Sequence, residues 1–271
     1  MTGFALEHDF VEYNGFFARP EMPRAAVCIL HGIGEHSGRY GRFGDYMAEK
    51  GIAVYGVDLP GHGLSPGIRG HIGKRSEFYG FVEGFLTHAA EENPGVPLYL
   101  MGHSMGGNLA LSYRLEHDDP RVTAYIIASP WLRLKHPPTF FTKGLIPLLA
   151  TLRPALTMRS GLKSGTYRPE ADGSGTRDPL IHGLITPRTA HDCFKASDRI
   201  LARAGEPGKP VYLFHGTEDG ICSIEGSRLF AAAAGRKICT FRAWKGLRHE
   251  TLHESVWTDV ADGVAGYILG E

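Results

Sequence analysis

The sequence predicts an α/β protein built on a doubly wound, mostly parallel β-sheet with an inserted helical cap (lid). Three observations carry this prediction: short apolar runs recur along the chain, helical stretches separate them, and one long segment interrupts the alternation. Continuous apolar runs are typical of strands buried on both faces, as in parallel sheets. A chain of 271 residues, 42% of them hydrophobic, is long enough to bury a large core.

The first expected element is a β-hairpin within residues 5–20. The dipeptide Asn14-Gly15 predicts its turn, and the hairpin is expected to lie antiparallel at the edge of the sheet. The strands that follow are read from apolar or β-branched runs. These runs cover residues 25–32, 52–61, 97–104, 122–130, 210–216 and 238–244.

Helical stretches lie between these runs. The first ends at Gly51, which suits a helix C-cap, and the second begins at Ser76 and stops before an Asn-Pro-Gly sequence. Strands alternating with helices imply a doubly wound sheet with right-handed crossovers. The expected helices cover residues 42–51, 76–95, 106–119, 223–235 and 255–269.

The alternation stops between residues 131 and 187, where the sequence is rich in Pro, Gly and bulky apolar residues and has no strand signal. A long insertion in a regular α/β pattern is usually functional. We therefore expect a core formed by residues 1–130 and 188–271, and an inserted cap subdomain formed by residues 131–187.

Composition excludes several classes of protein. A formal net charge of zero argues against nucleic acid as a partner, because nucleic-acid binding needs a basic surface. The N-terminal stretch has no apolar signal-peptide core, and no apolar run approaches the roughly 20 residues of a membrane span. The four cysteines form no paired motif, which indicates reduced thiols in a cytoplasmic protein.

The strongest chemical motif is Gly102-His103-Ser104-Met105-Gly106, a G-x-S-x-G pattern between an expected strand and an expected helix. This context is that of a nucleophile elbow, in which a tight turn lifts the serine hydroxyl above the carboxyl ends of the strands. The alternative is a chance Gly-Ser turn. The flanking strand and helix favour the elbow.

A serine nucleophile needs a base and an acid, which follow it in the order Ser, Asp, His in this kind of site. Two carboxylates, Glu218 and Asp219, follow the run at 210–216. Two histidines, His249 and His253, follow the last expected strand. The residues alone leave both choices open.

The same two histidines also form the zinc-peptidase pattern His-Glu-x-x-His. That pattern requires one helix through both histidines, but a strand-like run and Gly246 precede it. The extended zinc pattern would also place Gly at position 256 and His at position 259, where this chain has Val256 and Asp259. We therefore predict no metal site.

Four stretches together resemble a known family. They are "HGIGEHSGRY" (31–40), "DLPGHGLS" (58–65), "GHSMGG" (102–107) and the late pair "HGTEDGICSIEGS" and "KGLRHE". In this order they resemble the α/β-hydrolases of the monoacylglycerol lipase and lysophospholipase group, of the serine aminopeptidase S33 type. The resemblance spans most of the chain and implies the α/β-hydrolase fold.

The resemblance also implies which residues form the site. It places the nucleophile at Ser104, the acid at Asp219 and the base at His249. It assigns the oxyanion hole to the backbone N–H groups of Ile33 and Met105, where any side chain is tolerated.

The implied reaction is hydrolysis of a carboxylic ester through an acyl-enzyme, without a metal, nucleotide or organic cofactor. The expected substrate is a small-molecule lipid ester, with a monoacylglycerol favoured over a lysophospholipid or a general carboxylic ester. Two readings are less favoured. A serine aminopeptidase needs acidic residues in the cap to bind an amine, and a non-catalytic ligand-binding protein would not need a complete triad.

The cap is expected to receive the acyl chain or to pack on the core, and the two roles are compatible. Segment 131–188 carries nine Lys or Arg residues against three acids, which favours contact with an anionic membrane or micelle. The protein is thus expected to be cytoplasmic and peripheral to membranes. The residues expected to line the acyl-chain entrance are Phe140, Phe141, Leu145, Ile146 and Leu149.

Overall fold

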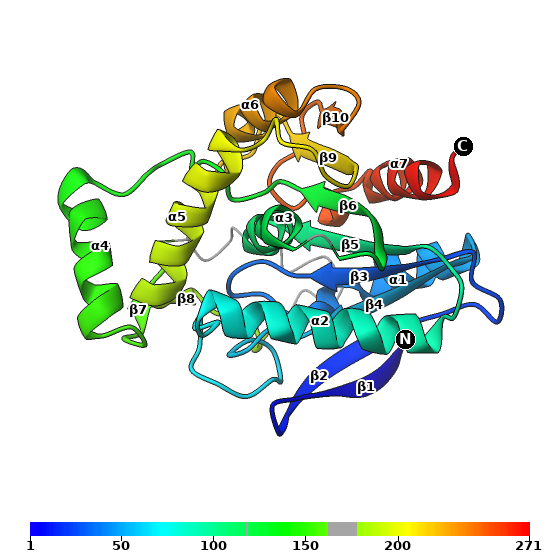
Figure 1. The fold of residues 1–271 in the computed structure, drawn as a ribbon, viewed down its shortest axis with the longest axis horizontal. Coiled ribbons are helices and arrows are strands. Elements are labelled where there is room, and N and C mark those ends of the chain that lie inside the picture. Colours follow the sequence, from blue (N-terminus) through cyan, green and yellow to red (C-terminus); the bar gives the residue numbers. More distant parts are fainter. Residues whose placement is uncertain (118, 162–177) are drawn as a thin grey trace.

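A computed structural model describes residues 1–117, 119–161 and 178–271, with the backbone alone for residues 140–143. Its centre is an eight-stranded sheet flanked by helices (Figure 1). The strand order is β1-β2-β4-β3-β5-β6-β9-β10. Strand β2 pairs antiparallel with β1 on one side and with β4 on the other. Every other pair of neighbours in this sheet is parallel. The predicted doubly wound, mostly parallel sheet is confirmed.

Each of the six apolar runs forms a strand of this sheet. The runs form β3, β4, β5, β6, β9 and β10, and each strand is one to four residues shorter than its run. The strands of the sheet are β1 (Thr2–His8), β2 (Val11–Ala18), β3 (Ala25–Leu30), β4 (Ile52–Val57), β5 (Leu98–His103), β6 (Val122–Ala128), β9 (Val211–Gly216) and β10 (Cys239–Trp244).

All five expected helices are present. Two further helices were not among the expected ranges: α4, which lies in the expected helical cap, and α5. The start of α5 carries standard signals: Thr186 caps it by accepting the Thr189 N–H, and Pro187 occupies the first turn. The helices are α1 (Gly41–Glu49), α2 (Arg75–Glu92), α3 (Met105–Glu116), α4 (Phe140–Leu152), α5 (Pro187–Ala202), α6 (Ile224–Ala234) and α7 (Trp257–Leu269), with short 3-10 turns η1 (Ser37–Tyr40) and η3 (Thr251–His253).

The helices divide between the two faces of the sheet. Strand β3 shows the division, because Ala26, Cys28 and Leu30 pack on one face while Val27 and Ile29 pack on the other. The first face is covered by α2, α3, α5 and α6, and the second by α1 and α7. Both faces are buried, which explains why the parallel strands are continuous apolar runs in the sequence rather than alternating patterns.

The N-terminal hairpin is antiparallel and lies at the sheet edge, but the prediction of its turn at Asn14-Gly15 was wrong. The turn is at Asp9 and Phe10, which both have positive φ, 50° and 61°, as a tight type I′ turn requires. The ring of Phe4 packs where a side chain at Gly15 would stand, so that glycine serves close packing inside β2.

The segment between β6 and α5 contains α4 and two short strands, β7 (Met158–Arg159) and β8 (Leu184–Ile185), which pair antiparallel. Helices α4 and α5 stand together at the end of the molecule toward which β3, β5 and β6 point (Figure 1). No strand signal is present in the sequence here because two-residue strands have no periodicity. The division into core and cap at residues 131–187 stays a prediction.

The five residues expected at the acyl-chain entrance have different surroundings. Ile146 is buried at 7% exposure, Leu145 is 49% exposed, and Leu149 is half-buried. The side chains of Phe140 and Phe141 lie outside the described residues. The described part of α4 therefore turns one side to the protein and another to solvent.

Strands β3 and β5 mark the point where the strand order reverses. From β3 the chain moves to β4 on one side, and from β5 it moves to β6 on the other side. In open α/β sheets the crevice outside the carboxyl ends of such neighbours is where ligands bind. The loops after β3 and β5 carry the residues around Ile33 and Ser104.

The cysteines and helices bear on the environment of the protein. Cys28, Cys193, Cys222 and Cys239 are all free and buried. In the portion of the chain that is described, every helix is too short or too polar to cross a bilayer.

Candidate active site

The turn between β5 and α3 places Ser104 in a strained backbone conformation, with φ 53° and ψ −114°. This region of φ/ψ space strongly favours glycine. The flanking glycines are required by close packing. A Cβ at Gly102 would collide with the Gly106 carbonyl, and a Cβ at Gly106 would collide with the Leu30 carbonyl. The geometry is that of a nucleophile elbow.

The elbow is fixed against its neighbours on both sides. The Ser104 N–H donates to the Ala128 carbonyl at the end of β6 (3.0 Å), and its carbonyl accepts the Trp131 N–H (2.9 Å). On the other side, a Cβ at Gly32 would lie 3.1 Å from the Ser104 Cβ. The loop after β3 therefore runs directly beside the serine.

Asp219 lies on the loop after β9 and is buried. One carboxylate oxygen, Oδ1, accepts the Ile221 and Cys222 N–H groups. The other, Oδ2, accepts from His215 Nε2 at 2.9 Å and His249 Nδ1 at 2.7 Å. Burial opposes the charge, but the two histidines outweigh it and hold the pKa of Asp219 well below its usual range.

His249 lies on the loop after β10 and directs Nδ1 to Asp219. Because a carboxylate only accepts, Nδ1 is the protonated nitrogen of the neutral ring and Nε2 is left as the basic one. The competing carboxylate Glu218 is exposed. Of the two carboxylates and two histidines left open by the sequence, the structure brings Asp219 and His249 together.

The Cys222 side chain lies close enough to Ser104 for the serine to lower its pKa slightly. Burial raises the pKa of the Cys222 thiol well above its usual range, so this neighbour is a neutral thiol. Among the described side chains, no hydrogen bond joins Ser104 to His249. His103, the residue before Ser104, contacts His249 directly: the centroids of the two rings lie 4.8 Å apart. Nucleophile–base contacts often tighten only when substrate binds.

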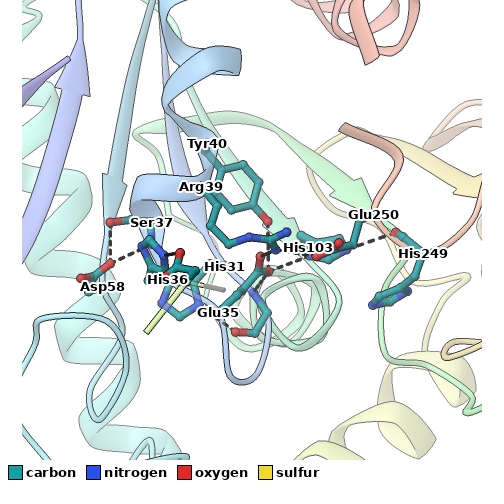
Figure 2. Close-up of polar contacts among 12 residues, drawn as sticks. His31, Glu35, His36, Ser37, Arg39, Tyr40, Asp58, His103, His249 and Glu250 are labelled. Carbon is teal, nitrogen blue, oxygen red and sulfur yellow. Dashed lines mark hydrogen bonds and ion pairs between the residues drawn. The ribbon is translucent and has the colours of Figure 1, made fainter. Parts of the chain in front are cut away.

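A buried ionic cluster lies behind this site, and the sequence prediction missed it (Figure 2). Glu35, fully buried, accepts from His103 Nδ1 at 2.8 Å, and His103 Nε2 donates to the His249 carbonyl at 3.2 Å. Both ring nitrogens thus act as donors, which requires a protonated ring. Burial alone would lower the pKa of His103, but Glu35 raises it above its ordinary value.

Arg39 completes the cluster by bridging two carboxylates, Glu35 and Glu250. The Arg39, Glu35 and Glu250 side chains are 5%, 1% and 6% exposed. Glu250 directly follows His249, so this arginine ties the loop after β3 to the loop after β10 (Figure 2). The stretch 31–40 contains Glu35 and Arg39, but nothing in it identifies partners so far along the chain.

The loop after β3 carries Ile33, the first expected oxyanion donor, and Met105, the second, begins α3 beside it. His31 holds the base of this loop. Its Nδ1 donates to the Gly32 carbonyl and its Nε2 accepts the Leu59 N–H at 3.0 Å, which fixes a neutral ring. Burial is the main cause of the lowered pKa of His31.

The His-Glu-x-x-His stretch does not form the helix that a zinc peptidase needs. His249 lies in a loop, and His253 ends the short turn η3. His253 is buried: it is 9% exposed, and burial lowers its pKa to about 4. Within residues 1–117, 119–161 and 178–271, no group of three or more His, Cys, Asp or Glu side chains could hold a metal ion.

A strained serine elbow beside an aspartate–histidine pair, at the carboxyl edge of this eight-stranded sheet, defines an α/β-hydrolase with a serine nucleophile. The chain belongs to the family described as serine aminopeptidase, S33, whose sequence model matches residues 21–256.

Relatives of known name are mainly lipases. Over 252 residues the chain is 28% identical to a monoacylglycerol lipase of Mycolicibacterium smegmatis, covering 91% of this chain and 89% of the relative. It is 26% identical over 245 residues to Phospholipase YtpA of Bacillus subtilis, covering 89% and 94%. The structure of the Paleococcus ferrophilus monoacylglycerol lipase superimposes with a TM-score of 0.83 at 28% identity, covering 94% and 98%. The chain is thus an ester hydrolase similar to monoacylglycerol lipases.

Proposed function

We propose that this protein hydrolyses monoacylglycerols through an acyl-enzyme formed on Ser104. The observation that carries the proposal is the Asp219–His249 hydrogen bond of 2.7 Å next to the strained Ser104 elbow. The relatives named monoacylglycerol lipase support the choice of substrate.

In the first half of the reaction, the Ser104 hydroxyl attacks the ester carbonyl carbon. His249 Nε2 takes the hydroxyl proton, and Asp219 stabilises the resulting imidazolium through Nδ1–H. The carbonyl oxygen gains the π electron pair and is bound by the N–H groups of Ile33 and Met105. Collapse of this intermediate expels glycerol, which takes the proton from His249, and leaves the acyl group on the serine.

In the second half, a water molecule replaces the alcohol. His249 removes a proton from the water as its oxygen attacks the acyl carbon, and the same two N–H groups bind the second oxyanion. Collapse returns the proton to the Ser104 oxygen and releases the fatty acid. No step requires a metal or an organic cofactor.

The acyl chain is proposed to enter through the cap formed by residues 131–187. Leucines at positions 145, 148 and 152 of α4 are 49%, 53% and 65% exposed. Leu156, just beyond the helix, is 47% exposed. Such a concentration of exposed leucine suits transient contact with a membrane or micelle that holds the lipid. We propose that the protein is cytoplasmic and that it makes this transient contact through α4.

A lysophospholipid is the second candidate substrate, because the B. subtilis relative is named a phospholipase. Both candidates are single-chain lipid esters, and they differ in the head group. An aminopeptidase activity has less support. The expected cap contains only three acids, and the one of them that is described, Asp178, is already bonded to His36.

The test combines active-site labelling with substrate profiling. A fluorophosphonate probe should label the wild type and fail to label Ser104→Ala, with Ser112→Ala, a buried serine on α3, as the labelled control. Turnover should rise from acetyl to medium and long acyl esters, and monoacylglycerol should exceed lysophospholipid. Labelling that persists in Ser104→Ala, or equal turnover of acetyl and long-chain esters, would overturn the proposal.

A further inference from the structure

The chain returns from the cap along residues 178–185 and lies against the loop after β3. His36 Nε2 donates to Asp178 Oδ2 at 2.6 Å, across 142 residues of sequence. Four residues later, the His182 N–H donates to the Gly34 carbonyl at 2.8 Å. Two hydrogen bonds thus join this segment to the loop that carries Ile33.

Asp178 is held firmly at this junction. Its second oxygen, Oδ1, accepts the Leu180 N–H at 2.8 Å, so both carboxylate oxygens have partners. The side chains of His36 and Asp178 are 11% and 29% exposed. Partial burial opposes the charge of Asp178, but the bonds from His36 and Leu180 prevail and lower its pKa. The residue is ionised and fixed at neutral pH.

The returning segment is also anchored away from the loop after β3. The Thr186 N–H donates to the Gly70 carbonyl at 3.2 Å, and the Thr186 hydroxyl contacts His71 Nδ1 at 2.9 Å. The His182 ring lies 5.0 Å from that of His62, measured between centroids. These contacts hold the returning segment in place independently of its bonds to the loop after β3.

The loop after β3 is thus held from two sides. On the core side, the buried carboxylate of Glu35 accepts the Gly32 N–H within the loop and also accepts from His103 at the end of β5. On the cap side, Gly34 and His36 bond to the returning segment. Ile33 stands between these two attachments, with a buried side chain. The direction of its N–H depends on both.

We propose that Asp178 is a positioning residue for the oxyanion hole: through His36 it holds the loop that presents the Ile33 N–H. This inference rests on the proposed function, because it assumes that Ile33 binds the oxyanion. It makes the end of the cap part of the catalytic framework, so the hydrolysis of esters too short to use the cap also depends on Asp178.

The expected effect falls on the transition state. A donor displaced by a fraction of an ångström loses much of its bond to the oxyanion, while the neutral ground-state ester depends little on it. Complete loss of an oxyanion donor lowers kcat by about 100- to 1,000-fold. Displacement through Asp178→Asn should lower kcat by about 10- to 100-fold and leave KM nearly unchanged.

The experiment measures kcat and KM with p-nitrophenyl acetate and butyrate for the wild type, Asp178→Asn and Asp198→Asn. Asp198 is an exposed aspartate on α5 and serves as the matched control. A trifluoromethyl ketone, which adds to the serine as a tetrahedral oxyanion, measures the same donors independently. Its inhibition constant should rise in Asp178→Asn by the same factor by which kcat falls.

A second variant separates positioning from general loss of structure. His36→Asn should reproduce the kcat loss, and the His36→Asn/Asp178→Asn double variant should lose no more than either single variant, because both act through one contact. Full kcat in Asp178→Asn, or multiplied losses in the double variant, would overturn the inference. A kcat loss without a change in ketone binding would do the same.

The controls also distinguish this failure from that of the proposed function. If wild-type Ser104 is not labelled by fluorophosphonate and turns over no ester, the proposed function fails. If the wild type is labelled and active while Asp178→Asn matches Asp198→Asn, only the role of Asp178 fails.

Discussion

Glu35 accepts hydrogen bonds from four groups in the buried cluster. It accepts from the Gly32 N–H, the Tyr40 hydroxyl, His103 and Arg39, and burial in this dry site would otherwise oppose its charge. The positive charges of His103 and Arg39 hold the pKa of Glu35 well below its usual range despite that burial. Removing one member of such a cluster leaves the others buried without compensation.

We therefore predict that Glu35→Gln lowers the free energy of unfolding by about 3–5 kcal/mol. Urea denaturation at pH 7 measures the change, and Glu21→Gln, at an exposed glutamate, should change stability by less than about 0.5 kcal/mol. Equal stabilities for the two variants would show that the cluster adds no net stability.

His253 gives the protein a specific sensitivity to acid. Burial lowers its pKa from 6.5 to about 4, so between these values the unfolded chain binds a proton that the folded chain does not. The stability that depends on neutral His253 is therefore complete above pH 6.5 and is lost as pH falls toward 4. One such proton changes the free energy of unfolding by about 1.4 kcal/mol per pH unit.

Between pH 6 and pH 5, His253→Gln should accordingly show a shallower fall of stability with pH than the wild type, by about 1 kcal/mol per pH unit. Urea denaturation at several pH values measures the slopes. His136→Gln, at an exposed histidine in the expected cap, should keep the wild-type slope. A parallel pair of curves for His253→Gln and wild type contradicts the prediction.

The residues predictable from sequence were those within a local motif. Ser104 is marked by two nearby glycines, and His249 and Asp219 by a strand that ends just before each. Glu35, His103 and Asp178 had no such mark, because their partners lie far along the chain: 68 residues separate Glu35 from His103. A pattern read along the chain cannot show which distant charges meet.

At the scale of single elements, the start of α3 shows packing overriding helix propensity. Alanine is a better helix former than glycine by about 1 kcal/mol, yet a Cβ at Gly106 would collide with the Leu30 carbonyl. Gly106→Ala is thus predicted to destabilise the protein by at least 3 kcal/mol or to prevent folding.

The matched control is Gly144→Ala in α4, where an added Cβ meets nothing within 4 Å. Here propensity alone acts, and the variant should be as stable as wild type or up to about 1 kcal/mol more stable. Thermal unfolding of both variants gives the comparison. Similar melting temperatures for the two variants would rule out a special requirement at the elbow.

The elements themselves were mostly predictable, because buried parallel strands are continuous apolar runs. The turn of the hairpin was not, since Phe10 adopts positive φ although aromatic residues rarely do, and it stands fully in solvent. Helix α5 was missed although Thr186 and Pro187 gave the usual signals of a helix start. The helix begins at Pro187, which is also the last residue of the predicted cap, and so its start was not recognised.

At the scale of the whole molecule, variants of the exposed leucines of α4 can distinguish binding to a lipid surface from the chemical step. The double variant Leu148→Ser/Leu152→Ser should lower turnover of long-chain monoacylglycerol in vesicles several-fold, because membrane contact is weakened by lost apolar area. Its turnover of soluble p-nitrophenyl butyrate should stay at the wild-type level.

Leu229→Ser provides the control, since Leu229 is 44% exposed on α6, outside the expected cap. This variant should hydrolyse both substrates like wild type. Equal activity of the α4 double variant on vesicles would show that these leucines do not serve lipid surfaces. Flotation of each variant with vesicles measures membrane contact directly.

The class of the whole fold followed from the sequence, but the strand order did not. Alternation of strands and helices predicts parallel pairing, and it says nothing about whether β3 lies next to β4 alone or between β4 and β5. That placement depends on how both faces of the sheet are filled at once. The junction of the returning cap segment with the loop after β3 depends on it in turn.

The backbone of Ser104 also has a consequence for selection in the laboratory. Its φ of 53° and ψ of −114° suit glycine better than serine. Ser104→Gly should therefore raise the melting temperature while abolishing turnover, as strained functional positions commonly do when relieved. A library sorted only for folding or solubility would enrich glycine at this position and drift toward inert proteins. Directed evolution of a hardier enzyme from this chain must score turnover in every round.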